Sequence, residues 1–233
     1  MQEISWKENL RVAWFGSFLT GASISLVVPF MPIFVEQLGI EGDQVAFYAG
    51  LAISVSAVSA ALVSPIWGIL ADKYGRKPMM IRAGLAMTIT MGGLAFVPNI
   101  YWLLFLRLLN GVFTGFVPNA TALIASQVPK DKSGAALGTL STGVVAGTLT
   151  GPFVGGFIAE IFGIRNVFLL VGAFLFLAAI LTIFFIKEDF QPVAKEKAIS
   201  TKEVFSSFKY PRLLVNLFLT SFVIQFSAQS IGP

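Results

Sequence analysis

The sequence predicts an all-α membrane protein: a bundle of six transmembrane helices, arranged as two inverted repeats of three helices, followed by the start of a seventh helix. Three observations predict this fold. Of the 233 residues, 56% are hydrophobic and 12% are charged, whereas soluble domains carry about 25% charged residues. The charged residues leave uncharged intervals, each long enough to cross a bilayer, since a spanning helix needs roughly 20 apolar residues. Two of these intervals, three crossings apart, end in similar sequences.

The uncharged intervals place each helix in turn. We expect helices near residues 12–35, 46–70, 79–97, 101–126, 135–160 and 164–186, and a seventh that begins near 212. The turn signal Val97-Pro98-Asn99 separates the third helix from the fourth. The first helix is too long for the apolar region of a cleavable signal peptide, so it would itself direct insertion. Because the seventh helix is still apolar at Pro233, we expect the chain to stop inside a membrane segment or at its edge.

These helices divide the chain into a bundle at 1–186, a central loop at 187–211 and a truncated seventh helix at 212–233. The loop fits a short surface helix and a disordered tether equally well. Fourteen of the 16 Lys and Arg residues would lie on the side of the N-terminus and the central loop. Cytoplasmic loops of membrane proteins carry such an excess. We therefore expect a multi-pass protein of the plasma membrane whose N-terminus and central loop are cytoplasmic.

The composition excludes several functions. The chain has neither Cys nor His, which removes disulfides, thiol nucleophiles, Cys/His zinc sites and His-based proton relays. No paired carboxylates and no nucleophile with a base are visible, so we expect neither an enzyme nor a metal or cofactor site. The net charge of +4 follows from the topology and predicts no nucleic-acid partner. A P-loop of an ATP-driven exporter is absent from the sequence, and a seven-helix receptor would require an external N-terminus.

The internal repeat lies in the second halves of the second and fifth helices. In both, a proline is followed three residues later by a glycine, and the helix closes with Ala and an acid: Pro65 with Asp72, and Pro152 with Glu160. The two prolines are separated by three crossings, and an odd number of crossings inverts the second copy. Inverted repeats of three helices are an architecture of secondary transporters.

A second motif, Gly68-Ile69-Leu70-Ala71-Asp72-Lys73-Tyr74-Gly75-Arg76-Lys77-Pro78, joins the second and third helices. Gly68 would let another helix approach closely, and Gly75 would permit the turn. Asp72 can lie at a helix N-terminus or pair with a base, while Arg76 and Lys77 keep the loop inside. The motif resembles the G-x-L-A-D-x-x-G-R-K signature of the major facilitator superfamily. The resemblance implies that this loop latches two six-helix halves together on the cytoplasmic side.

The fourth predicted helix carries an arginine, in Arg107-Leu108-Leu109-Asn110-Gly111. A charge inside the bilayer costs at least about 2.5–3.5 kcal/mol, so Arg107 must face the bundle interior or extend to the membrane interface. The element is similar to an R-x-x-x-G element of the same superfamily, and the resemblance implies a role in proton coupling.

Glycines recur every fourth residue in the fifth helix. Residues four apart share one face, so these glycines form a groove against which another helix can pack. The segment from Gly147 to Gly156 resembles the antiporter motif of the superfamily's twelve-helix drug:proton antiporters. The motif residues are Gly143, Gly147, Gly151, Pro152, Gly155 and Gly156.

Polar residues in apolar helices indicate a substrate cavity, although each could equally serve as an interhelical hydrogen bond. The candidates are Thr20, Ser23, Asn119, Gln225 and Gln229.

The resemblance implies that a monomer in membrane lipid exchanges small hydrophobic drug-like compounds for protons. The proton gradient would drive this exchange without a cofactor. The alternative is a metabolite or sugar carrier of the same superfamily. No carboxylate is expected in mid-membrane, so the coupling acid would be Glu36, Glu160 or a residue of a second half.

Overall fold

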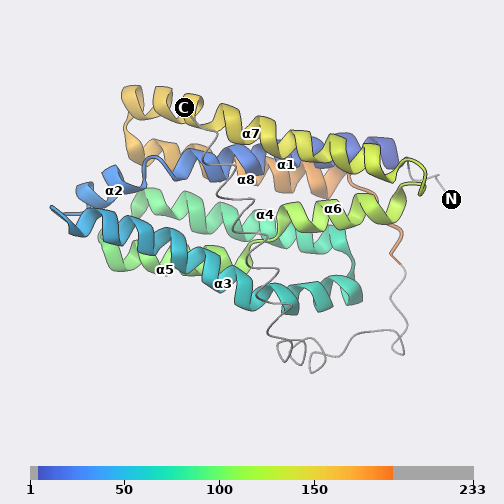
Figure 1. Ribbon diagram of the computed structural model, residues 1–233, viewed down its shortest axis with the longest axis horizontal. Coiled ribbons are helices and arrows are strands. Elements are labelled where there is room, and N and C mark those ends of the chain that lie inside the picture. The colour runs from blue at the N-terminus through green and yellow to red at the C-terminus, as the bar shows by residue number, and fades with distance from the viewer. Residues whose placement is uncertain (1–4, 191–233) are drawn as a thin grey trace. The chain divides into compact units, whose positions relative to one another are not determined.

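The computed structural model describes residues 5–190. Segments 191–211 and 212–233, with Gln225 and Gln229, lie outside the described residues. The described part is helical without strands (Figure 1), and its elements are α1 Trp6–Val27, α2 Met31–Gln37, α3 Gln44–Tyr74, α4 Arg76–Gly92, the 3-10 helix η1 Gly93–Phe96, α5 Ile100–Phe113, α6 Phe116–Gln127, α7 Ser133–Phe162 and α8 Ile164–Phe185. Within residues 5–190, six spans are long and apolar enough to cross a membrane, with α4–η1 and α5–α6 each forming one span. The prediction of six helices is confirmed.

Two of the predicted helices are not continuous. The first ends at Val27 and resumes at Met31, across a segment in which Pro29 and Pro32 have no N–H to donate. The fourth ends at Phe113 and resumes at Phe116, because Gly115 has a φ of +133°, a conformation that glycine adopts readily. The helices predicted over 12–35 and 101–126 are therefore each interrupted at these points.

Helix packing is uneven around the bundle. In Figure 1 the α1 ribbon lies along α7 and α8, and the main contacts join α1 to α7, α4 to α8 and α3 to α5. The most apolar windows of α3 and α7 are only 22% and 17% buried, against 56% for α1 and 50% for α4–η1. Since α3 and α7 are long and apolar but poorly covered, much of their surface is available to lipid or to further protein.

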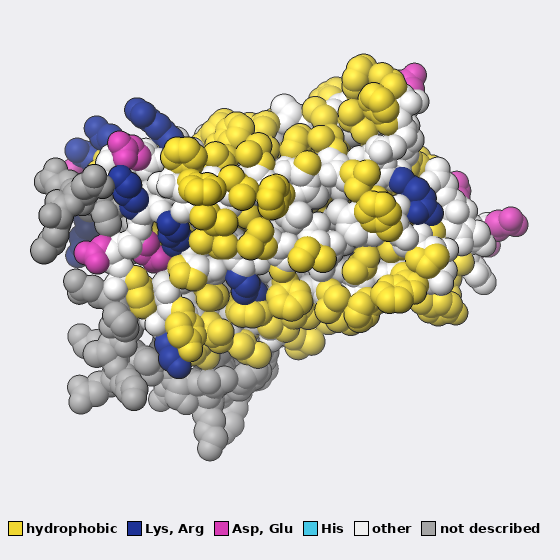
Figure 2. All heavy atoms as spheres, turned by 180° about the vertical axis from the view of Figure 1, so that it is seen from behind, with side chains coloured by type: hydrophobic (Ala, Val, Ile, Leu, Met, Phe, Trp, Pro, Cys, Tyr) yellow, Lys and Arg dark blue, Asp and Glu magenta, His cyan; other side chains and the backbone are white. Residues whose placement is uncertain are grey.

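Charge separates the two ends of the bundle. We name them after the glycines where the chain turns there: the Gly75 end, which also holds the start of α1, and the Gly163 end. Figure 2 shows Lys and Arg gathered mainly at one end, a broad hydrophobic band in the middle, and acidic side chains with one basic group at the other. Such a band between two polar ends is typical of a protein that spans a bilayer.

The turns at the two ends have the same backbone geometry. Gly75 closes α3 with φ 99° and ψ 163° and directly precedes α4. Gly163 closes α7 with φ 84° and ψ 161° and directly precedes α8. Both glycine N–H groups donate to a carbonyl four residues back, Gly75 to Ala71 over 2.9 Å and Gly163 to Ala159 over 3.0 Å. Two equal hairpins at opposite ends support the predicted inverted repeat.

Candidate functional site

The loop at the Gly75 end is held by charged groups. Arg76 Nη2 pairs with the Asp72 carboxylate one turn earlier. Lys77 Nζ donates to the carbonyl of Ile183 over 2.9 Å, near the end of α8. Of the two arrangements open to Asp72, the structure shows pairing with a base. The loop therefore ties the start of α4 to the end of α8.

Glu188 also holds this loop, a role that we did not predict from the sequence. Its two carboxylate oxygens accept from the backbone N–H groups of Arg76 and Lys77, each over 2.7 Å. These are among the first amides of α4, which have no acceptor within the helix, and a carboxylate is favourable at that positive end. A Cβ on Gly75 would lie 2.8 Å from Glu188 Oε2, so glycine is needed there for space as well as for its φ.

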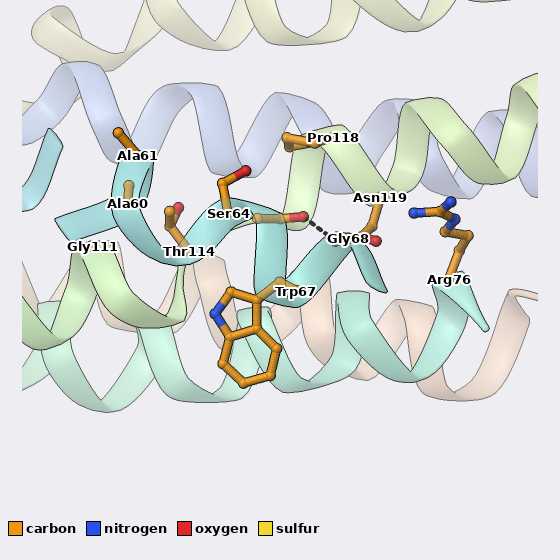
Figure 3. Close-up of a pocket in the computed structure, with 11 residues that line it drawn as sticks. Ala60, Ala61, Ser64, Trp67, Gly68, Arg76, Gly111, Thr114, Pro118 and Asn119 are labelled. Carbon is orange, nitrogen blue, oxygen red and sulfur yellow. Dashed lines mark hydrogen bonds between the residues drawn. The ribbon is translucent and has the colours of Figure 1, made fainter. Parts of the chain in front are cut away.

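Gly68 does not have the close neighbour that we expected. Within the described part, a Cβ added to Gly68 would meet no atom within 4 Å. Instead Gly68 lines a cavity of about 350 Å³, the Trp67 cavity, between α3, α5 and α6. Figure 3 shows Ser64, Thr114 and Asn119 on its walls and Arg76 at one end. The predicted close approach is not made by any helix of residues 5–190.

Arg82 contacts Trp67, one of the residues that line this cavity. Because α4 begins at Arg76, Arg82 lies about 9 Å along the helix from that end. Its guanidinium carbon lies over the Trp67 ring, 3.4 Å from the ring centre, a cation–π arrangement. Nη2 donates to Thr114 O over 3.3 Å. Nε and Nη1 are buried without a partner in the described part.

Arg107 faces the bundle interior, which excludes extension to the membrane interface. It is only 7% exposed. Its Nε donates to the carbonyl of Ala52 over 3.0 Å, and Nη1 lies 3.6 Å from Met91 Sδ. It lines a second cavity of about 240 Å³, the Arg107 cavity, together with Ser23 and Asn110. No Asp or Glu of residues 5–190 lines this cavity, so the buried cation has only neutral neighbours there.

The candidate polar residues do not form one site. Ser23 lines the Arg107 cavity and Asn119 the Trp67 cavity. Thr20 lines neither of these cavities: it is 2% exposed and its hydroxyl donates to Gly16 O over 2.8 Å. Ser23 and Asn119 also bond within their own helices, to Leu19 O over 2.8 Å and Gly115 O over 2.7 Å. The Thr20 hydroxyl hydrogen is therefore donated to the backbone of its own helix and is not available to a substrate.

The glycine face of α7 is filled by α1. A Cβ would lie 2.6 Å from Trp14 O at Gly143, 2.7 Å from Ala22 N at Gly147 and 2.8 Å from Ala22 O at Gly151. Gly155 is also covered, with its Cβ position 2.8 Å from Phe30 Cε2. Gly156 has no atom of the described part within 4 Å and does not take part in this packing. The motif therefore combines a glycine face packed against its neighbours with one open glycine, Gly156, four positions after Pro152.

The chain is similar to known membrane transport proteins. The family described as Major Facilitator Superfamily matches residues 13–233. The chain is 88% identical over 233 residues to the multi-drug resistance efflux pump PmrA of Streptococcus pneumoniae, covering 100% of this chain and 58% of that protein. It is 55% identical to the PmrA homolog of Lactococcus lactis, covering 99% and 57%. It is 50% identical to the multidrug resistance protein MdtG of Proteus mirabilis, covering 98% and 57%. The chain thus spans under three fifths of these relatives.

Solved structures share the fold at low sequence identity. The human organic anion transporter MFSD10 (TETRAN) superposes with a TM-score of 0.72 at 17% identity, covering 87% of this chain and 53% of that one. The POT family transporter PepTSo gives 0.71 at 14% identity, covering 82% and 40%. Each match uses about half of the larger chain, which agrees with a single six-helix unit.

Proposed function

Because the chain belongs to the major facilitator superfamily, we propose that it forms the first half of a multidrug exporter, which exchanges hydrophobic drug-like compounds for protons by alternating access. The relatives named for multidrug efflux support the drug class. The whole protein would be a transporter rather than an enzyme, a monomer in membrane lipid, and driven by the proton gradient without a cofactor.

The Gly75 end would face the cytoplasm. It holds Lys7, Arg11, Lys130 and Lys132 besides the loop, whereas the Gly163 end holds Glu36, Glu41, Asp43 and Glu160 with Arg165. Short cytoplasmic loops carry the excess of Lys and Arg. The N-terminus would therefore be cytoplasmic and the protein would lie in the cell membrane.

The buried Arg107 is the observation that carries the coupling proposal. A cation held by Ala52 O and by a thioether in an apolar cavity favours the charged form of any acid brought near it. A carboxylate that enters this cavity would release its proton more readily, and it would take one up when it moves away. Such an acid would come from Glu36, Glu160 or the second half, since the cavity has none of its own among residues 5–190.

Drug-dependent proton flux in proteoliposomes tests this function. Drug added outside the vesicles should enter in exchange for protons that leave, so the full-length protein should alkalinise the lumen. Arg107→Ala should abolish that exchange while Arg11→Ala, at an exposed position, should not. Undiminished exchange in Arg107→Ala would remove Arg107 from the mechanism. Counterflow of a sugar or metabolite without drug transport would instead favour the alternative carrier.

A further inference from the structure

The loop at the Gly75 end has a counterpart at the Gly163 end. Counted from the two turn glycines, the sequences agree at five further positions, 88 residues apart: Gly68 with Gly156, Ala71 with Ala159, Asp72 with Glu160, Tyr74 with Phe162, and Lys77 with Arg165. Pro65 and Pro152 are 87 residues apart, whereas the two turn glycines are 88 residues apart. An alignment of the two repeats on their turn glycines is therefore shifted by one residue from an alignment on their prolines.

The surroundings of the glycines support this new alignment. Gly68 and Gly156 are both half-buried, and a Cβ at either would meet no atom of the described part within 4 Å. Gly155, which the proline alignment pairs with Gly68, is instead packed against α1 and Phe30. Each hairpin therefore presents one open glycine on a poorly covered helix, about two turns before its turn glycine.

The cations two residues after each turn bind reciprocally. Lys77, at the start of α4, donates to Ile183 O near the end of α8. Arg165, at the start of α8, donates from Nη1 to Ala95 O over 2.7 Å and from Nη2 to Val97 O over 3.2 Å, at the end of η1. The helices α4 and α8 thus each begin with a cation that donates to carbonyls at the C-terminal end of the other span. A positive charge is favourable at a helix C-terminus.

We propose that residues 156–165 form an outer latch, the counterpart of the loop at 68–77, which closes the Gly163 end when the Gly75 end is open. The proposal rests on the alternating access proposed above. Gly156 and Glu160 would contact the second half, and Arg165 is a positioning residue that holds the hairpin to η1. Ile164 stands where Arg76 stands, so within the described part Glu160 lacks the ion pair of Asp72 and its exposed carboxylate can bind a partner.

Cysteine labelling from outside the cell tests the latch, because these 233 residues contain no cysteine. The probe is Val28→Cys, which lines the Arg107 cavity at the end of α1, in a full-length protein without other cysteines. Labelling by a membrane-impermeant maleimide measures how often the outer end is open. Gly156→Ala and Arg165→Ala should raise the labelling rate about three- to tenfold, as expected for losing hydrogen bonds from a charged donor or a tight contact.

The loop at the Gly75 end provides the opposite arm. Gly68→Ala and Asp72→Asn should lower the labelling rate at position 28, because they favour opening of the Gly75 end. Gly138→Ala, at an exposed position, should leave the rate unchanged. Arg165→Lys should retain part of the closure, since Lys still donates to one carbonyl. Unchanged labelling in Gly156→Ala and Arg165→Ala, or a change of the same sign in both loops, would overturn the latch. Labelling needs no drug, so opposite shifts in a protein that transports no drug would uphold the latch and refute the proposed substrate.

Discussion

Asn9 and Lys187, 178 positions apart, bond to each other twice. Asn9 Nδ2 donates to the Lys187 carbonyl over 2.6 Å, and the Lys187 N–H donates to Asn9 Oδ1 over 2.9 Å. Gln127 joins them, accepting from Asn9 over 2.7 Å and donating to Lys187 O over 3.0 Å. These bonds therefore join the start of α1, the end of α6 and the end of α8 at the point where the central loop begins. The next residue, Glu188, accepts from the first amides of α4.

Asn9→Ala should destabilise the bundle by about 1–3 kcal/mol, because Asn9 is 1% exposed and its loss removes the acceptor of the Lys187 N–H and one of the two donors to the Lys187 carbonyl. Denaturant unfolding in detergent measures the change. The exposed Asn166→Ala is the control and should change stability by less than about 0.5 kcal/mol. Equal effects of the two variants would contradict the role of the Asn9–Lys187 pair.

Glu188→Gln should expose the first amides of α4. A neutral amide side chain has one acceptor oxygen in place of two, so the N–H of either Arg76 or Lys77 loses its partner. Hydrogen exchange at these two amides should accelerate roughly tenfold, the equivalent of about 1.4 kcal/mol for one hydrogen bond to a charged group. Asp189→Asn, at the exposed neighbouring acid, should leave their exchange unchanged; acceleration in both variants would show only general loosening of the chain.

Gly147→Ala and Gly138→Ala should change stability in opposite directions. A Cβ at Gly147 would lie 2.7 Å from Ala22 N, and overpacking costs about 1–3 kcal/mol. A Cβ at Gly138 meets nothing within 4 Å, and alanine is favoured over glycine in a helix by about 0.5–1 kcal/mol. Thermal unfolding of the two variants gives the comparison. A stabilised Gly147→Ala would show that α1 and α7 are not in close contact.

Arg107→Met should separate stability from transport. Removing a buried charge that has no carboxylate partner in the described part should leave the free energy of unfolding unchanged or raise it by about 1 kcal/mol or more. Coupled drug–proton exchange should nevertheless be lost. Unfolding and flux measured on the same preparations test both halves of this expectation. A marked loss of stability would mean that the bonds to Ala52 and Met91 outweigh the cost of burial.

The helices and the glycine face could be predicted because they depend on local spacing. Uncharged runs located the spans to within a few residues, and the four-residue interval from Gly143 to Gly155 indicated the face that α1 covers. Gly75 was recognisable as a turn for the same reason: a glycine between two apolar runs is a short-range signal.

Features that depend on distant contacts could not be predicted. Glu188 is 112 positions from Arg76, and nothing near it in the sequence indicates that α8 ends beside the start of α4. The open surroundings of Gly68 are equally a property of packing, because a glycine that allows close approach and a glycine that lines a cavity look alike in sequence. The break at Gly115 follows from the φ of +133° at that residue, a conformation that a glycine within an apolar run does not reveal in the sequence.

The break between α5 and α6 gives Arg82 a further importance. In an unbroken helix the carbonyl of Thr114 would accept from the residue four positions on, but that residue is Pro118, which has no N–H. Arg82 Nη2 donates to this carbonyl instead, so a side chain of α4 replaces a peptide hydrogen of a different helix. The fourth span therefore depends on a residue of another span at the point where its own helix is broken. A replacement of Arg82 that cannot donate would leave the Thr114 carbonyl without this hydrogen bond.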